Sequence, residues 1–491
     1  MKLNELLPAT EEKFDLKLLE TLEISNITSD SRKVSPGGLF FAIQGEKFDG
    51  VNFVRMAETR GAVIVITYSG GSKRCKELGV SIPIIEVKNV RKVLSYAAYK
   101  WFGKQPKEIV AITGTNGKTS VAAFLKKIWD NLGIKCASIG TLGADGIADS
   151  SNELTTPDPL SLHKYLAELK SKGVDHIVLE ASSHGLKQNR LDHVNITSRA
   201  FTNLSRDHLD YHGGLDEYFL AKAILFTKNQ NLGGISIINV NEYYGRLMKL
   251  IAEDNGFNVI GVGHFQGSKF RIIKQSMQVG GQVLSVSLDS KTYTFQLNLM
   301  GAFQGENVVM AAALAIASGA NPDRVFSILP NLTAPEGRLQ FIAETKSGAK
   351  IFLDYAHSPE ALRKVLLAVR PHTFGNLFLV FGAGGDRDKG KRKIMGEVAE
   401  FYADKVYITD DNPRFENANM IRKEIKRGCP KGINVPDRAK AILVAISELK
   451  SGDNLIVAGK GHERGQKIGN TTYPFDDSEQ ISMSVELLES S

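Results

Sequence analysis

The chain has 491 residues, of which 42% are hydrophobic and 23% are charged. This length suggests about three domains of ~150 residues each, and the composition excludes an intrinsically disordered chain. Lysine and arginine (61) outnumber aspartate and glutamate (54), which gives a formal net charge of +7 without a long run of like charges. Because nucleic-acid binders usually concentrate their basic residues on one stripe, this mild excess favours small anionic ligands.

Three widely spaced cysteines, Cys75, Cys136 and Cys429, provide neither a disulfide framework nor a zinc-binding spacing. This cysteine usage fits a reducing compartment. The N-terminal sequence has no basic segment followed by an apolar core, and the longest weakly polar stretch, residues 308–320, is shorter than the ~20 residues that cross a bilayer. We therefore expect a soluble, cytoplasmic protein without membrane insertion.

Short β-branched runs alternate with helix-like stretches along the chain, a pattern typical of a parallel sheet with helices on both faces. The predicted strands are residues 62–67, 84–87, 109–113, 176–180, 236–240, 377–381, 405–409 and 454–458. Most of these runs are apolar without alternation, as expected when both faces of a sheet are covered. The fold class is therefore predicted as α/β.

Residues 263–299 change to β-hairpin-like alternation around Gly280-Gly281 and Asp289-Ser290, which predicts a β excursion in the middle of the chain. Two seams interrupt the pattern. One lies near residues 89–107, where the amphipathic residues 93–102 are followed by Gly103 and Pro106, and the other lies near residues 334–340, where proline and glycine break the helical spacing. These seams predict three domains, which comprise residues 1–95, 96–337 and 338–491.

A glycine-rich loop, residues 114–120 (GTNGKTS), lies between the predicted strand 109–113 and apolar residues at helical spacing. In such a loop, backbone N–H groups can face phosphate oxygens, and the helix N-terminus adds partial positive charge. Lys118 is predicted to reach a terminal phosphate and Thr119 to bind Mg²⁺. The standard spacing requires glycine where Ile112 stands, so the sequence indicates a shortened loop for a nucleoside triphosphate.

Acidic and histidine residues follow the next predicted strands. Glu180 ends strand 176–180, where parallel sheets place ligands, and is either a metal ligand or a surface carboxylate. Residues 203–212 (NLSRDHLDYH) add acids and two histidines. Because Mg²⁺ prefers oxygen ligands, we expect these histidines to orient other groups, with at most one of them coordinating. Lys222 lies in a helical pattern, and composition alone places it on a solvated face.

A second glycine-rich segment, residues 382–392 (GAGGDRDKGKR), follows strand 377–381. A dinucleotide fingerprint needs glycine where Arg387 stands, which disfavours an NAD-dependent oxidoreductase. Arg387, and Arg414 in the segment DDNPR, can each grip a carboxylate through two hydrogen bonds or serve as exposed ion-pair partners. Glu463, in the segment GKGHE, either holds an ammonium group or belongs to a plain turn.

A series of motifs resembles those of the Mur ligase family of peptidoglycan synthesis: GTNGKTS, LEASSHGL, NLSRDHLDYHG, YFLAK, LDYAHSPEAL, GAGGDRDKGKR, DDNPR and GKGHE. The resemblance extends from about residue 29 to residue 463. GTNGKT alone would also suit a folylpolyglutamate synthase, but TSDSR at 28–32, GEKFDG at 45–50 and DNPR favour the cell-wall enzymes.

This resemblance implies an N-terminal domain for a uridine nucleotide, a central P-loop ATPase domain with a parallel sheet, and a C-terminal Rossmann-like domain that selects an amino acid. By similarity, the ATP-binding residues would be Gly114, Thr115, Asn116, Gly117, Lys118, Thr119, Ser120, Asn307, Arg338 and Asp354, with His357 in the same linker motif as Asp354. The residues against the UDP-linked substrate would be Ser29, Ser31, Glu46, Lys47, Phe48, Thr155, Thr156, Ser182, Gln188 and Arg190. The residues against the amino acid would be Arg387, Asp411, Asn412, Pro413, Arg414, Gly459 and Glu463.

The reaction that the resemblance implies is an ATP-driven amide ligation. The γ-carboxylate of UDP-N-acetylmuramoyl-L-alanyl-D-glutamate would attack ATP to give an acyl phosphate, and the amine of meso-diaminopimelate would displace phosphate. The catalytic residues would be Lys118, Glu180, His208 and Lys222, and those that hold Mg²⁺ would be Thr119, Glu180, His208 and Lys222 as a carbamate. Arg414 favours diaminopimelate, which has a second carboxylate, while L-lysine stays the alternative. The protein is expected to be a monomer.

Two other classes stay open. A P-loop small-molecule kinase would release ADP without needing an amine. A nucleotide-dependent switch would hydrolyse slowly and bind a protein partner, and it would leave the downstream acidic, histidine and arginine segments without a role.

Overall fold

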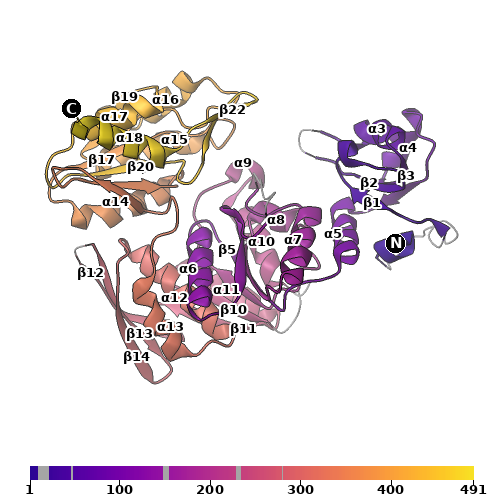
Figure 1. Cartoon of the computed structure of the whole chain (residues 1–491), viewed down its shortest axis with the longest axis horizontal. Helices are drawn as coiled ribbons and strands as arrows, with labels where there is room; N and C mark the ends of the chain where they lie inside the picture. Colours follow the sequence, from indigo (N-terminus) through magenta and orange to yellow (C-terminus); the bar gives the residue numbers. More distant parts are fainter. Residues whose placement is uncertain (9–20, 46–47, 148–153, 228–233, 279, 491) are drawn as a thin grey trace. The chain divides into compact units, whose positions relative to one another are not determined.

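The computed structural model of the chain describes residues 1–8, 21–45, 48–147, 154–227, 234–278 and 280–490. These residues form two compact units, and Figure 1 labels many of their elements. Unit 1 consists mainly of residues 1–111 and 135–197, and unit 2 mainly of residues 112–134, 198–226 and 234–490. The chain passes from one unit to the other inside β5 (Glu108–Thr113), the strand that leads into the glycine-rich loop.

Unit 1 begins with a parallel four-stranded sheet that has helices on both faces. Its elements are α1 (Leu3–Leu6), β1 (Asn26–Thr28), β2 (Gly38–Ala42), α3 (Val54–Thr59), β3 (Ala62–Tyr68), α4 (Gly71–Glu77), β4 (Ile84–Val87) and α5 (Val90–Phe102). Successive side chains of β2 point to opposite faces, so that Phe41 packs with α1 and α5 while Phe40 packs with α3 and α4. α5 begins where the Asn89 side chain accepts a hydrogen bond from Lys92 N.

The remainder of unit 1 contains β6 (Cys136–Gly140), β7 (Gly143–Ala144), α7 (Pro159–Ser171), β8 (His176–Glu180) and α8 (Ser183–Lys187). β6 pairs in parallel with β8 and antiparallel with β7. α7 begins at Pro159 because the Asp158 carboxylate accepts from the N–H groups of Leu160 and Ser161. This arrangement leaves Glu180 at the carboxyl end of β8.

The central part of unit 2 combines a mixed sheet with helices. Its elements are α6 (Lys118–Asn131), β9 (Ser198–Phe201), α9 (Leu209–His212), α10 (Leu215–Ala223), β10 (Ile235–Asn239), α11 (Tyr243–Asp254), β11 (Asn258–Gly263), β12 (Phe270–Gln278), β13 (Gly281–Leu288), β14 (Lys291–Leu297), α12 (Ala302–Ala317) and α13 (Pro322–Ile328). Pairing is parallel from β9 through β12 and antiparallel from β12 to β14. The predicted β excursion is therefore confirmed, and α6 packs against α12.

The last part of unit 2 is a three-layer sandwich. Its elements are β15 (Gln340–Glu344), β16 (Lys350–Asp354), α14 (Pro359–Val369), β17 (Leu377–Phe381), α15 (Gly390–Tyr402), β18 (Lys405–Ile408), α16 (Ala418–Lys426), β19 (Ile433–Asn434), α17 (Arg438–Ser447), β20 (Asn454–Ala458), the hairpin β21 (Gly465–Ile468) and β22 (Thr471–Pro474), and α18 (Asp477–Ser490). The sheet order is β15-β16-β20-β17-β18-β19, parallel except for β15. α14 to α16 cover one face of this sheet, and α17 and α18 cover the other.

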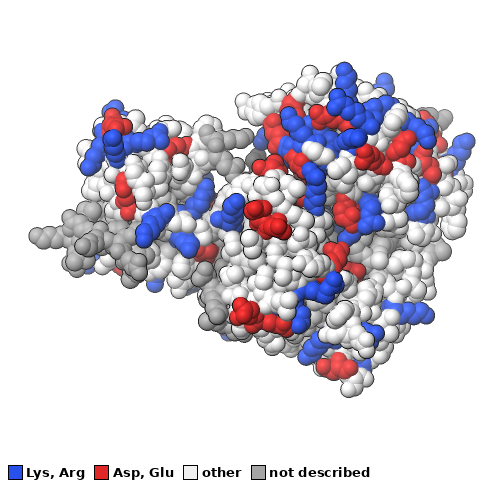
Figure 2. Space-filling view, turned by 180° about the vertical axis from the view of Figure 1, so that it is seen from behind, with Lys and Arg blue, Asp and Glu red and all other residues white. Residues whose placement is uncertain are grey.

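Charges of both signs lie side by side on the surface. On the face that Figure 2 shows, lysine and arginine side chains are interleaved with aspartate and glutamate. One ion pair is fully buried: Arg438 donates from Nε and Nη2 to the two carboxylate oxygens of Asp477, at 2.7 Å each, and so joins α17 to α18. Within the described residues, no helix is both long and apolar enough to cross a membrane.

The α/β fold class is confirmed, and each strand that the sequence predicted begins and ends within one residue of the observed strand. The central sheet is mixed rather than wholly parallel, because β13 and β14 in unit 2 and β7 in unit 1 pair antiparallel with their neighbours. The domain boundaries after residues 95 and 337 stay a prediction.

Candidate active site

The glycine-rich loop between β5 and α6 has room only for glycine at two positions. Gly114 has φ +146°, and a Cβ atom there would lie 1.8 Å from Thr202 Oγ1. Gly117 has φ +88°, and its Cβ would lie 2.7 Å from Asn307 Oδ1. Both the left-handed backbone and the close neighbours therefore require glycine, which leaves the N-terminus of α6 open to a ligand.

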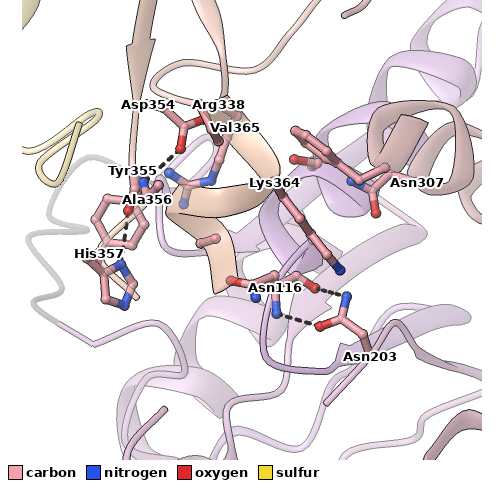
Figure 3. A pocket seen from close by; sticks show the side chains of 14 residues that line it. Asn116, Asn203, Asn307, Arg338, Asp354, Tyr355, Ala356, His357, Lys364 and Val365 are labelled. Atoms are coloured by element: carbon pink, nitrogen blue, oxygen red, sulfur yellow. Dashed lines mark hydrogen bonds between the residues drawn. The ribbon is translucent and has the colours of Figure 1, made fainter. Parts of the chain in front are cut away.

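The segment after β9 holds this loop in place. The side chain of Asn203 accepts from Asn116 N at 3.0 Å and donates to Asn116 O at 3.1 Å, as Figure 3 shows. Thr115 N donates to Asn203 O at 2.9 Å, and Thr115 Oγ1 accepts from Ser205 N at 3.0 Å. The loop is thus preorganised by hydrogen bonds from a segment that the sequence analysis identified for its acids and histidines.

Two lysine side chains meet at one carbonyl of the loop. Lys118 Nζ donates to the carbonyls of Gly114 and Thr115 at 3.0 Å each, and Lys222 Nζ donates to Gly114 O at 2.9 Å. Lys222, on α10, is only 1% exposed. Burial, reinforced by the Lys118 charge, lowers the pKa of Lys222 well below its usual value. The solvated-face interpretation of Lys222 is therefore wrong, and a neutral amine is the form that can react with carbon dioxide to give a carbamate.

A pocket beside the loop has about 620 Å³ of empty space, including its open mouth. It is lined by Asn116, Gly117, Ser120, Asn203, Phe303, Asn307, Arg338, Asp354, Tyr355, Ala356, His357, Ala361, Lys364 and Val365 (Figure 3). The structure therefore brings the predicted loop together with Asn307 of α12, Arg338 before β15, and Asp354 and His357 at the end of β16. A phosphate-binding loop next to a partly apolar wall can accommodate a nucleotide.

Arg338 and Asp354 are fixed by their neighbours. Arg338 Nη2 donates to Thr119 Oγ1 at 3.2 Å, and its guanidinium lies 4.3 Å from the centre of the Tyr355 ring. Asp354 accepts from Leu339 N at 2.6 Å and from Ala356 N at 2.7 Å. Burial raises the pKa of Asp354 to about 6. The Arg338 guanidinium and the buried Asp354 carboxyl thus lie near each other on the wall of the pocket.

Three groups that can carry a positive charge lie around the Asp207 carboxylate, next to this pocket. Its carboxylate lies 3.3 Å from His357 Nε2, 3.5 Å from His208 Nε2 and 3.8 Å from Lys391 Nζ. Although burial opposes ionisation, these neighbours hold the pKa of Asp207 well below its usual value. Burial lowers the pKa of His208, so its imidazole is neutral near pH 7 and can coordinate a metal, whereas uptake of a proton is disfavoured in the free protein.

Part of the predicted set of Mg²⁺ ligands has the donor chemistry that Mg²⁺ requires. Mg²⁺ bound with a nucleotide usually takes one or two protein oxygens and completes its shell with phosphates and water. Among the residues that the structure describes, no cluster of three or more His, Cys, Asp or Glu side chains could hold a metal. The Thr119 hydroxyl beside the loop has the right donor chemistry for such a shared site. Glu180 belongs to unit 1, where its carboxylate accepts from Thr141 N at 2.9 Å and from Thr141 Oγ1 at 3.0 Å.

The predicted sugar-peptide residues of unit 1 form one hydrogen-bonded cluster. Thr156 Oγ1 donates to Glu180 O at 2.7 Å and contacts Ser182 Oγ at 3.0 Å. Arg190 donates to Thr156 O and to Gln188 Oε1, at 2.7 Å each. Glu180 is 3% exposed, so the surface-carboxylate interpretation is wrong. The fifth predicted residue, Thr155, has its hydroxyl 3.3 Å from Thr141 Oγ1.

The described residues of the predicted uridine set lie in the segments that follow β1 and β2 of unit 1. Ser29 is exposed after β1, whereas Ser31 is buried and contacts Met56 Sδ at 3.4 Å. Phe48 is 72% exposed and makes an edge contact with Phe53. Glu46 and Lys47 lie outside the described residues.

The predicted amino-acid residues lie at the carboxyl ends of β17, β18 and β20, where parallel sheets present ligands. Arg387 is exposed, and among the described residues no hydrogen bond or ion pair holds its side chain. Arg414 Nη1 donates to Gly385 O at 2.8 Å. Asn412 Nδ2 donates to Glu463 Oε2 at 2.8 Å, which brings together Asp411-Asn412-Pro413 and the turn after β20. At Gly459 a Cβ atom would lie 2.7 Å from Asp411 Oδ2.

Sequence reasoning missed several residues that the structure places at these sites. Asn203 and Asp207 stand in the segment NLSRDHLDYH, which was predicted to hold ligands or bases, but of its residues only His208 was predicted as a site residue. Lys364 lines the pocket from α14, and its helical pattern carries no signal that distinguishes it from a solvated lysine. Arg392 and Glu416 are buried or half-buried among the amino-acid loops, although both belong to charged stretches that suggest a surface.

Comparisons with known proteins cover most of the chain. Three family descriptions match: "Mur ligase family, catalytic domain" over residues 23–101, "Mur ligase middle domain" over 112–315 and "Mur ligase, glutamate ligase domain" over 337–461. The UDP-N-acetylmuramoyl-L-alanyl-D-glutamate–2,6-diaminopimelate ligase of Chelativorans sp. (strain BNC1) is 45% identical over 461 residues, which are 93% of this chain and 94% of that protein. The ligase of that name from Agrobacterium fabrum is 44% identical and covers 97% and 96% of the two chains. A solved structure of a ligase with this name has a TM-score of 0.69 and 30% identity, and covers 100% of this chain and 99% of its own.

Proposed function

This chain belongs to the Mur ligase family, and from that premise we propose that it ligates meso-diaminopimelate to UDP-N-acetylmuramoyl-L-alanyl-D-glutamate with ATP as co-substrate. Its curated relatives carry the name of that ligase over most of the chain. The observation that carries the proposal is the loop at 114–120, where Lys118 and Lys222 both reach Gly114 O beside a pocket that can hold a nucleotide.

The proposed reaction has two steps. The γ-carboxylate of the D-glutamyl residue attacks the γ-phosphorus of ATP, so that an acyl phosphate forms and ADP leaves. The neutral amine of the amino acid then attacks the acyl carbon, and the tetrahedral intermediate expels phosphate to leave an amide. Lys118 and the N–H groups at the start of α6 offset the charge that develops on the phosphoryl oxygens. His208 is the candidate to accept the proton of the amine when it does not hold Mg²⁺.

Thr119 is proposed to hold Mg²⁺ together with Glu180, His208 and the carbamate of Lys222. Bound Mg²⁺ neutralises charge on the phosphates during transfer. The burial of Lys222 and its depressed pKa support the modification, because a lysine must lose its proton before its nitrogen can attack carbon dioxide.

The amino acid is proposed to bind at the carboxyl ends of β17, β18 and β20. Arg387 and Arg414 would pair with its carboxylates, and Glu463 would pair with its ammonium group. The UDP-linked substrate is proposed to contact Ser29, Ser31, Glu46, Lys47 and Phe48, with the cluster around Thr156 and Arg190 against its sugar-peptide. We also propose a cytoplasmic monomer with domain boundaries after residues 95 and 337.

A product-mass assay tests the proposal. The protein is incubated with the UDP-muramoyl dipeptide, ATP, Mg²⁺ and an equal mixture of diaminopimelate and L-lysine, and both product mass and ADP release are followed. We expect the diaminopimelate adduct, and ADP release that depends strongly on the amino acid. ADP release without an amine would indicate a kinase instead, and a lysine adduct would correct the assigned amino acid.

A further inference from the structure

Two loops carry the arginines proposed to bind the amino acid, and a buried pair of opposite charges joins them. We define residues 382–389 as the glycine loop and residues 410–417 as the arginine loop. Arg392, near the start of α15, has a side chain that is 1% exposed. Its Nη1 and Nη2 donate to the two carboxylate oxygens of Glu416, at the end of the arginine loop, at 3.0 and 2.9 Å. Such a two-point pair fixes both partners in orientation as well as in distance.

This pair bonds directly to the backbone of the glycine loop. Arg392 Nη2 donates to Gly384 O at 3.2 Å, and Glu416 Oε1 accepts from Asp386 N at 2.6 Å. The hydrogen bonds from Arg392, with a smaller contribution from the Asp386 N–H, lower the pKa of Glu416 to about 2, although burial opposes this shift. The carboxylate is therefore ionised near neutral pH. The two side chains therefore link the glycine loop to the arginine loop.

Both loops need such support because each has a residue in the left-handed region. Asp386 has φ +51° and Arg414 has φ +52°, a conformation that is unfavourable for residues other than glycine. Further bonds connect the same segments: Gly385 N donates to Asn412 O at 2.9 Å, and Arg414 Nη1 donates to Gly385 O at 2.8 Å. These hydrogen bonds thus hold one residue of each loop in an unfavourable backbone conformation.

The strained Asp386 directly precedes Arg387. Within the described part of the chain, no hydrogen bond or ion pair holds the Arg387 side chain, and it is exposed. The direction in which Arg387 leaves the loop is therefore set by the backbone at Asp386, which Glu416 holds. Arg414 is held by other bonds: its Nη1 donates to Gly385 O, its N–H donates to Lys467 O and its carbonyl accepts from Gly469 N. The Arg392–Glu416 pair therefore holds the backbone that carries Arg387 against the loop that carries Arg414.

We infer that Arg392 and Glu416 are positioning residues that set the spacing of Arg387 and Arg414, and thereby select an amino acid with carboxylates at both ends. This inference rests on the proposed function. It adds to that function two residues that contact no proposed substrate. Their role is to fix the relative position of the two loops whose guanidinium groups are proposed to bind the carboxylates.

The test compares Glu416→Gln with Glu424→Gln. Glutamine at 416 keeps the shape of the side chain, but its NH₂ group must face a donor, either Arg392 or Asp386 N. Glu424 is the matched control: it accepts from the same Arg392 Nη1 at 2.8 Å, but among the described contacts it bonds neither loop. For Glu416→Gln we expect the KM for diaminopimelate to rise roughly tenfold or more, with kcat within about threefold and the KM values for ATP and the UDP-linked substrate within about twofold. Glu424→Gln should leave all of them within about twofold.

Amide hydrogen exchange of the free proteins gives a second readout. Glu416→Gln should speed exchange in both loops, and Glu424→Gln in neither. If Glu416→Gln is insoluble, Arg392→Lys replaces it, because lysine keeps the charge but loses the two-point geometry. The inference is overturned if the KM for diaminopimelate stays within about twofold, if both glutamine variants act alike, or if all three KM values rise together. Failure of the wild-type protein to ligate any amine would instead refute the proposed function, while hydrogen exchange would still test the link between the loops.

Discussion

Lys222 has a buried amine that shares the Gly114 carbonyl with Lys118. Its depressed pKa makes the neutral, carbon-dioxide-reactive form accessible near neutral pH. Arginine at this position would remain charged and could form no carbamate, so we expect Lys222→Arg to lower the rate of ligation at least about 100-fold, as for loss of an electrostatic group at a reacting centre. Product mass and ADP release measure this. Lys249→Arg, on α11, is the control and should retain full activity; comparable rates in both variants would contradict the role of Lys222.

Arg414 offers a second test at the level of one residue. Its guanidinium is proposed to pair with the far carboxylate of diaminopimelate, which lysine lacks. We expect Arg414→Ala to lower kcat/KM for diaminopimelate by about 100-fold, roughly the loss of one charged hydrogen-bonded pair, and to affect L-lysine less. The exposed Arg427→Ala serves as control. Unchanged kinetics with diaminopimelate would remove Arg414 from the binding site.

Individual residue types were predictable where a local motif defines them, and less so where burial does. The glycines and Lys118 follow from spacing alone, because the chemistry of a phosphate loop requires them in order. The sequence around Lys222 and Arg392 suggests surface residues, because their neighbours are charged or helical. In the structure both are buried, because distant segments pack over them. Contacts of this kind have no signature within a single stretch of sequence.

Helix α6 offers a test in which its two ends are compared. Gly117, before the first turn, has φ +88°, and an added Cβ would lie 2.7 Å from Asn307 Oδ1. Gly133, after the last turn, has φ +77°, and an added Cβ would have no heavy atom within 4 Å. Alanine at either site should cost about 1–2 kcal/mol of unfolding free energy for the left-handed backbone. We expect only Gly117→Ala to weaken the binding of Mg-ATP, by roughly tenfold or more, because it also displaces the pocket wall. Calorimetric titration and urea unfolding measure the two effects, and equal loss of binding in both variants would contradict the assignment.

Secondary-structure elements were predicted best where they are apolar and buried. β8 and β17 match the predicted ranges because their runs of apolar residues end at polar turns. The hairpin β21–β22 was not predicted, since its strands are polar and largely exposed. The Gly469-Asn470 pair between them was the available signal, as a two-residue turn that contains glycine.

At the scale of the whole molecule, a buried histidine makes stability depend on pH. His163 on α7 is 1% exposed, and burial lowers its pKa from 6.5 to about 4. Because the unfolded chain takes up the proton first, the stabilising contribution is complete above about pH 6.5 and is lost as the pH falls toward 4. As the pH falls from about 7.5 to 5, protonation of this histidine in the unfolded chain should lower the free energy of unfolding by about 2 kcal/mol.

The measurement is urea unfolding at the two pH values. His163→Gln can still donate to Asp192 O but cannot ionise, so its loss of stability between the two pH values should be smaller than that of the wild-type protein by this amount. His264→Gln changes an exposed histidine and should behave as wild type. Parallel pH profiles for wild type and His163→Gln would show that another group causes the loss.

The organisation of the whole chain was only partly visible in the sequence. Proline and glycine near residues 334–340 indicate a linker, whereas the compact units follow packing: each predicted boundary falls inside one unit, and the chain enters and leaves unit 2 more than once. Local breaks in a pattern report where a chain turns. They do not report which distant segments pack together.

The packing of α6 on α12 has a consequence for how the protein is made. The apolar face of α6, with Phe124, Leu125 and Ile128, emerges from the ribosome long before Ala302–Ala317, the helix that covers it. Until α12 has been synthesised, this face lacks the helix that packs against it in the native structure, and exposed apolar surface of this kind is prone to aggregation. A premature stop before residue 302 would remove α12 altogether, so the truncated chain would never form this contact.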